Sequence, residues 1–148
     1  KREAGKLPSR SVRLHRAIYQ AHPTANCIIT AQSPNVTAYA ISEARFDTRT
    51  IPESYVLLRD IPVIPYGTQF RDPERVAAAL SPATPVLLIQ NDAVMTTGST
   101  ILKAFDRLEV AEFSAKALLD TAMIGRHVPI GDEDIADLKK AFNLAEED

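Results

Sequence analysis

The hydrophobic and polar positions of this chain follow two periods in turn, one typical of helices and the other of strands. Apolar residues recur at helical spacing from a serine cap to about Ala21 and, for the longest stretch, over residues 99–124. A capping residue followed by proline predicts the starts of two shorter helices, at Pro34 and Pro73. An acidic first turn and a basic last turn predict a final helix from Asp132.

Short apolar runs that stop at polar residues predict the strands. Cys27–Ala31 is one such run. Val86–Ile89 and residues 94–97 are two more, and the Asn and Asp between them are typical of a tight hairpin. Residues 61–65 predict a short edge strand, because proline cannot donate a hydrogen bond to a sheet. Residues 42–55 carry only a weak pattern, which predicts a loop.

Together these elements predict a single α/β domain over residues 1–148, with a mixed, largely antiparallel sheet flanked by helices. The strands are few for such a domain, so we expect further strands either upstream or from a neighbouring chain. The chain also opens without methionine, which favours a piece of a longer protein. The acidic end, residues 143–148, is expected to fray.

Composition narrows the class of protein. The 148 residues include 17 basic and 19 acidic side chains, so the net charge of −2 gives no electrostatic reason to expect nucleic acid or an anionic membrane. Cys27, the one cysteine, lies in an apolar run, as a free thiol in a reducing compartment does. No apolar run approaches the roughly 20 residues of a membrane span. We therefore expect a cytoplasmic protein.

Polar side chains at the ends of the predicted strands are the first candidates for a site. Thr30 and Gln32 are two residues apart and point the same way if the strand continues, and Asp92 occupies the hairpin turn. The three could converge at one edge of the sheet. Each also has a plain structural interpretation, because threonine suits a strand, glutamine a strand-to-helix turn and aspartate a hairpin.

The start of the first helix is a second candidate. Ser9 or Ser11 would cap it, and Arg10 would lie close to the positive end of the helix dipole, where anions bind. Arg10, Arg13 and Arg16 recur every three residues, which favours a solvated face or a subunit contact over an anion site. Farther along the chain, Glu112 and Lys116 on the longest helix are expected to pair.

The three histidines offer no ligand pattern. His15 lies inside the first helix, His22 at its end before a proline, and His127 in a loop. None has a His-x-His or His-x-x-x-His spacing to another, and a scattered histidine is more often structural or solvated than a ligand.

Several segments, taken in order, make the chain similar to the class II aldolase/adducin family, which includes L-fuculose-phosphate aldolase. The similarity spans nearly the whole chain and corresponds to the later two thirds of a family domain. The Gly-rich loops that help these enzymes hold a substrate phosphate would precede it. The matching segments are residues 5–9, 14–19, 22–23, 27–34, 37–40, 64–68, 86–88 with Asn91, and 104–113.

This resemblance implies which positions carry the family's chemistry. Active members hold zinc with a His-x-His pair and a third histidine, and a glutamate moves protons. Here the pair falls on Thr30 and Gln32, the third ligand on Asp92, and the glutamate on Ser11. Zinc sites need imidazole or thiolate ligands, and a serine hydroxyl is no base near neutral pH unless another group activates it. No metal is therefore expected, although the family uses zinc.

Two functions follow from this pattern. The first is a degenerate family domain without catalysis, serving as a binding, scaffolding or oligomerisation module, alone or beside a companion aldolase-like domain. Adducins are the family's precedent for this fold without aldolase chemistry. The alternative is an active aldolase or epimerase, a carbon–carbon lyase type acting on a sugar phosphate. It would use a hard cation at Asp92 or residues from another chain. A small-anion site at Ser9 and Arg10, without turnover, is a further possibility.

Overall fold

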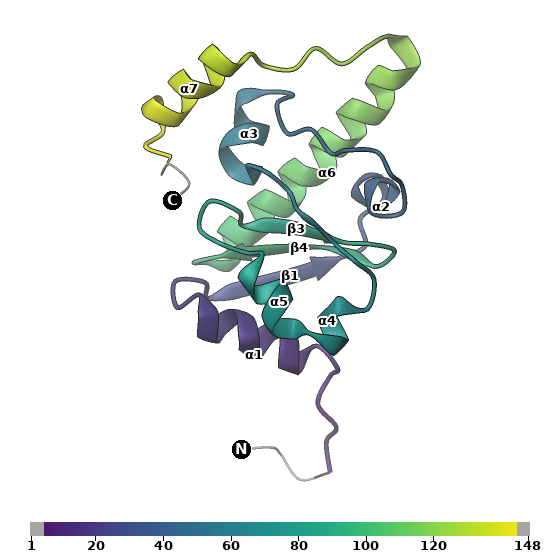
Figure 1. Cartoon of the computed structure of the whole chain (residues 1–148), viewed down its shortest axis with the longest axis vertical. Coiled ribbons are helices and arrows are strands. Elements are labelled where there is room, and N and C mark those ends of the chain that lie inside the picture. Colours follow the sequence, from purple (N-terminus) through teal and green to yellow (C-terminus); the bar gives the residue numbers. More distant parts are fainter. Residues whose placement is uncertain (1–4, 145–148) are drawn as a thin grey trace.

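The structure is a computed structural model that describes residues 5–144, and its centre is a four-stranded sheet (Figure 1). The strand order is β1 (Cys27–Ala31), β4 (Ala93–Gly98), β3 (Val86–Ile89) and β2 (Val63–Ile64). β4 pairs antiparallel with both of its neighbours, whereas β2 pairs parallel with β3. The predicted mixed, largely antiparallel sheet is confirmed, including the hairpin and the edge position of the proline-flanked strand.

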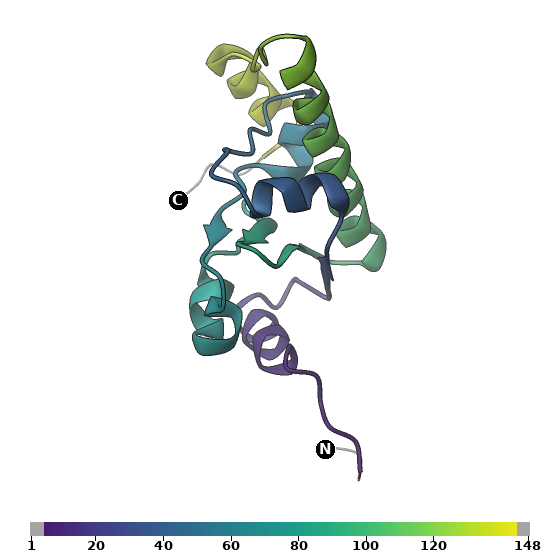
Figure 2. The same ribbon diagram turned by 90° about the vertical axis from the view of Figure 1, so that its right-hand side faces the viewer.

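Helices cover both faces of the sheet (Figures 1 and 2). One face carries α1 (Val12–Ala21), α4 (Thr68–Arg71) and α5 (Pro73–Ala78). The other carries α2 (Pro34–Ala40), α3 (Pro52–Leu58) and the long α6 (Ile101–Ile124). The last helix, α7 (Asp132–Ala141), packs against α3. The α/β layered architecture expected from the sequence is therefore present.

The central hairpin explains why there are two hydrophobic cores. Along β3, Val86 and Leu88 pack with α2, α3 and α6, while Leu87 and Ile89 pack with α1 and α5, because successive side chains of a strand point to opposite faces. Both sets are buried, as in a sheet covered on both sides. Thr30 of β1 pairs with Met95, whose side chain belongs to the α1 and α5 core, so Thr30 faces α1.

Local predictions failed in three places. The expected loop over residues 42–55 ends earlier, because Pro52 begins α3 as a first-turn proline. The long helix begins at Ile101 rather than at residue 99, since the Thr100 side chain caps it by accepting from the Lys103 N–H at 3.2 Å. The short helix α4 was not expected at all; it follows Gly67, whose φ of 81° is in the left-handed region that glycine adopts readily.

The expected Glu112–Lys116 pair is also absent. Glu112 accepts hydrogen bonds from α2 instead, and Lys116 donates to Asp120 at 2.8 Å. At the carboxyl end, most of the tail expected to fray lies outside the described residues. Within residues 5–144, no helix has both the length and the apolar character needed to cross a membrane.

Candidate functional site

A cavity of 360 Å³ opens between α1, α4 and the β3–β4 hairpin. Three of the four positions to which the resemblance assigns the family's chemistry line it: Ser11 at the start of α1, Thr30 on β1 and Asp92 in the hairpin turn. Gln32 is not among the lining residues; it is exposed beyond the end of β1. The remaining lining residues are Leu14, His15, Gln69, Phe70, Ile89 and Met95.

The hairpin places Asp92 at the cavity through its turn geometry. Asn91 adopts a positive φ of 55°, a conformation that asparagine tolerates better than most residues. The Asp92 N–H donates to the Ile89 carbonyl at 3.1 Å, which closes the turn. The Asp92 side chain is thereby fixed beside α4.

Gln69 of α4 is the principal partner of this carboxylate. Its Nε2 donates to Asp92 Oδ2 at 2.7 Å, and Gln69 is only 4% exposed. Gln69 Oε1 is buried and has no hydrogen-bond partner within residues 5–144. Buried polar atoms nearly always have a partner, so this oxygen has acceptor capacity that no described residue uses.

His15 also lines the cavity, one helical turn after Ser11. It is half-buried, and burial lowers the pKa of its imidazole below the ordinary value. The ring is therefore neutral near pH 7, with one nitrogen able to donate and the other to accept. The sequence offered one signal for this residue, because Ser11 and His15 are four apart and share a helix face.

The candidate anion site at Ser9 and Arg10 is arranged differently from a free helix terminus. The Ser9 and Ser11 hydroxyls lie 2.9 Å apart and bond to each other. The Arg10 guanidinium stacks on the Phe70 ring, 4.8 Å from its centroid, and Phe70 lines the cavity. Arg10 therefore lies at the border of the cavity, held by an aromatic ring.

The residues present do not fit a zinc ion. Thr30 supplies a neutral hydroxyl, and the Asp92 carboxylate already accepts from Gln69. Among residues 5–144, no three His, Cys, Asp or Glu side chains lie close enough together to hold a metal. The other histidines are engaged elsewhere: His22 bonds to the Ala77 carbonyl at 2.7 Å, and His127 lies 3.9 Å from Asp47.

Comparison with known proteins relates this architecture to sugar-phosphate enzymes. The family model for the class II aldolase and adducin N-terminal domain matches residues 1–119. The L-fuculose phosphate aldolase of Escherichia coli K12 is 33% identical over 150 residues, an alignment that covers 96% of this chain and 67% of that protein.

Two further similarities mark the range of these relatives. The crystal structure of YgbL from Klebsiella pneumoniae, a putative aldolase/epimerase/decarboxylase, superposes with a TM-score of 0.75 at 26% identity. It covers 92% of this chain and 68% of that one. Human beta-adducin is 26% identical over 98 residues, which is 64% of this chain and 13% of that protein.

Proposed function

Because the chain belongs to the class II aldolase and adducin family, we propose that it is a non-catalytic member, a pseudoenzyme that serves as a binding and oligomer-forming module. The observation that carries this proposal is the set of side chains at the family's ligand positions. It consists of a hydroxyl, an amide and one carboxylate that is already hydrogen-bonded, from Thr30, Gln32 and Asp92.

The chemistry of aldol cleavage explains why this set matters. In metal-dependent enzymes of this class, the ion stabilises the negative charge that develops when the carbon–carbon bond breaks. None of the three side chains is an imidazole or thiolate, the ligands from which zinc sites are built. Ser11, at the position of the family's glutamate, shares its hydroxyl with Ser9 and has no carboxylate to take up a proton.

The exposed surface of α6 supports the second half of the proposal. Leu102, Phe105 and Phe113 are 70%, 51% and 58% exposed, which is unusual for large apolar side chains gathered on one helix. Apolar surface of this kind is typical of protein–protein contacts, so we propose association through α6 with another copy or a companion domain. We place the module in the cytoplasm because Cys27 is a free thiol in an apolar strand.

Metal binding tests the proposal directly. We expect the metal-free protein, titrated with zinc in a calorimeter, to show no stoichiometric tight binding. A variant carrying Thr30→His, Gln32→His and Asp92→His should gain one zinc per chain, because it restores three imidazole ligands. His15, His22 and His127 serve as the internal control, since they are present in both proteins.

The outcome that contradicts the proposal is equally plain. If the natural chain takes up one zinc per chain tightly, and Asp92→Asn removes that binding, the site is a metal centre and the pseudoenzyme proposal is wrong. Weak binding that persists in Asp92→Asn would come from scattered surface groups and would leave the proposal standing.

A second function is favoured by the cavity itself. Gln69 Oε1 is buried beside the Asp92 carboxylate and has no partner within residues 5–144, which suits a small hydroxylated molecule, and relatives are named as sugar-phosphate aldolases. In this alternative the chain is an aldolase or epimerase that uses a hard cation at Asp92 or residues from another chain. Sugar phosphates are assayed with magnesium, manganese or calcium. Turnover that is lost in Asp92→Ala but kept in Lys116→Gln would establish it.

A further inference from the structure

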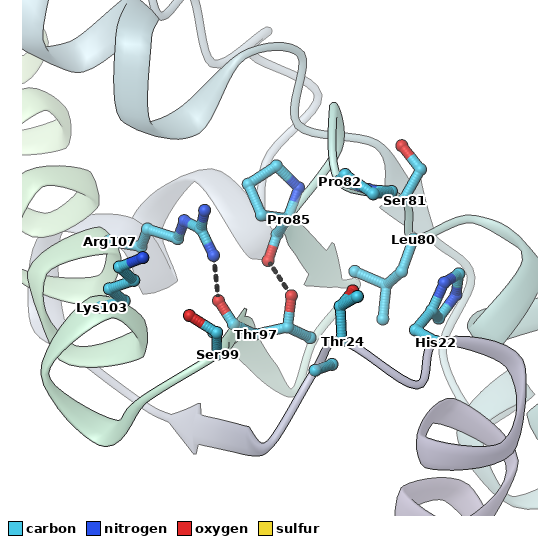
Figure 3. Close-up of a pocket in the computed structure, with 12 residues that line it drawn as sticks. His22, Thr24, Leu80, Ser81, Pro82, Pro85, Thr97, Ser99, Lys103 and Arg107 are labelled. Carbon is cyan, nitrogen blue, oxygen red and sulfur yellow. Dashed lines mark hydrogen bonds between the residues drawn. The ribbon is translucent and has the colours of Figure 1, made fainter. Parts of the chain in front are cut away.

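A second cavity, of 160 Å³, lies at the opposite end of the strands (Figure 3). It is bordered by the end of β4, the first turns of α6, the segment after α1 and the loop before β3. It shares no lining residue with the cavity described above. An inference drawn from this second cavity is therefore independent of the proposed function.

This cavity is positively charged. Lys103 and Arg107 both line it, and because they are four residues apart on α6 they lie on one helix face. Among residues 5–144, no aspartate or glutamate contributes to the lining. Within residues 5–144, neither side chain forms an ion pair. Two cations thus border one hollow without a counter-charge from the described chain.

Arg107 has hydrogen-bond donors that no residue within 5–144 accepts from. Its guanidinium donates to the Thr97 carbonyl, the contact drawn in Figure 3, yet it carries five N–H donors in all. The side chain is half-buried, and burial lowers the pKa of Arg107 because a charge is costly to remove from water. A neutral carbonyl satisfies one donor and none of the charge, so an anion against the free donors would stabilise this arrangement.

From these contacts we propose that the second cavity binds a small oxyanion of the phosphate class between Lys103 and Arg107. Ser99 and Thr24 line the same hollow and can donate hydroxyl hydrogen bonds to further oxygens. The volume of 160 Å³ is about five times the share of one water molecule in the liquid, so the hollow has room for inorganic phosphate or for the phosphate group of a compact monoester.

Nuclear magnetic resonance of the whole chain, titrated with inorganic phosphate at neutral pH and constant ionic strength, tests the site. We expect saturable shifts in the backbone amides of residues 97–107. Lys103→Gln should weaken the affinity at least about tenfold, because a charged partner of the anion is lost. Lys103 is exposed, so this variant should fold as the natural chain does.

Lys116→Gln is the matched control, since it removes the same charge from the same helix outside the cavity. It should leave the phosphate affinity unchanged. Chemical shifts that grow without saturation would overturn the proposal, and so would an equal loss of affinity in Lys103→Gln and Lys116→Gln. In either case the role of Arg107 would be the structural hydrogen bond to the Thr97 carbonyl. A parallel titration with sulfate, which is also a tetrahedral oxyanion, should give the same saturable pattern, and the absence of saturation with both anions would overturn the proposal.

Discussion

At the scale of single residues, the contact between Gln69 and Asp92 decides the character of the larger cavity. A carboxylate in a hairpin turn would ordinarily be free to bind a cation or a substrate. Here one of its oxygens is held by a buried amide at 2.7 Å, while the amide's own oxygen lacks a partner within residues 5–144. The hydrogen-bonding capacity of the Gln69 amide is therefore only partly used. The stability of a variant at position 92 should depend on whether the new side chain can still accept a hydrogen bond from Gln69.

We expect Asp92→Ala to lower the free energy of unfolding by about 1–3 kcal/mol, because it leaves both the nitrogen and the oxygen of the buried Gln69 amide without a hydrogen-bond partner. Asp92→Asn should cost less, since its side-chain oxygen can still accept from Gln69 Nε2. Urea unfolding of both variants measures the difference. Equal losses for the two variants would mean that the hydrogen bond contributes little and that the packing of the turn dominates.

The sequence located part of this site and missed the rest for a physical reason. Ser11, Thr30 and Asp92 could be singled out because they lie at ends of predicted elements or at positions of family motifs. Gln69 could not, because it lies on a helix of four residues that has no periodic pattern to read. Its role depends on a contact across 23 positions of the chain, which only the fold brings about.

At the scale of elements, one side chain of α6 begins another helix. Glu112 accepts from the Asn35 and Val36 N–H groups at 3.0 Å each, and from the Asn35 side chain at 2.7 Å. These N–H groups belong to the first turn of α2. In the first turn of a helix, the backbone N–H groups have no carbonyl acceptor within the same helix. Ser33, the residue at the cap position, makes no capping hydrogen bond with its side chain. Glu112 of α6 therefore caps the amino terminus of α2.

This arrangement makes stability depend on pH. Burial alone would raise the pKa of Glu112, but the hydrogen bonds from Asn35 and Val36 outweigh it and hold the pKa below its ordinary value. The contribution is therefore present above the unfolded pKa of about 4.3 and is lost as the pH falls through the folded value. We expect Glu112→Gln to lower the free energy of unfolding at neutral pH and to flatten its decline in acid.

Glu109→Gln is the control for that experiment, because Glu109 is exposed on the same helix. Urea unfolding from neutral to acidic pH should show an unchanged decline for Glu109→Gln. If Glu112→Gln declined in acid as steeply as the natural chain, another carboxylate would be responsible.

The same comparison shows where reading elements from sequence fails. Proline after a capping residue correctly marked the starts of α2 and α5, at Pro34 and Pro73. Pro52 begins α3 in the same way, but Ile51 before it is not a capping residue, so the local signal was weak. The strands were easier, because continuous apolar runs reflect a sheet buried on both faces.

At the scale of the whole molecule, α6 covers one face of the sheet with its inner side and exposes large apolar residues on its outer side. We expect the protein to associate in a concentration-dependent manner, measured by sedimentation. Phe105→Ser with Phe113→Ser should shift the equilibrium toward the monomer, because it removes apolar surface that association would bury.

Tyr66→Ser provides the comparison for association, since Tyr66 is an exposed aromatic residue away from α6. It should leave the sedimentation profile unchanged. A protein that stays monomeric at all concentrations would show that the α6 surface does not mediate self-association.

The two borders of the sheet differ in the backbone groups that they leave for another strand. β2 is two residues long and flanked by Pro62 and Pro65, which have no N–H to donate to an added strand. β1 is five residues long and, within residues 5–144, pairs on one side only. A further strand, from upstream in a longer chain or from a neighbouring chain, would therefore extend the sheet at β1 and not at β2.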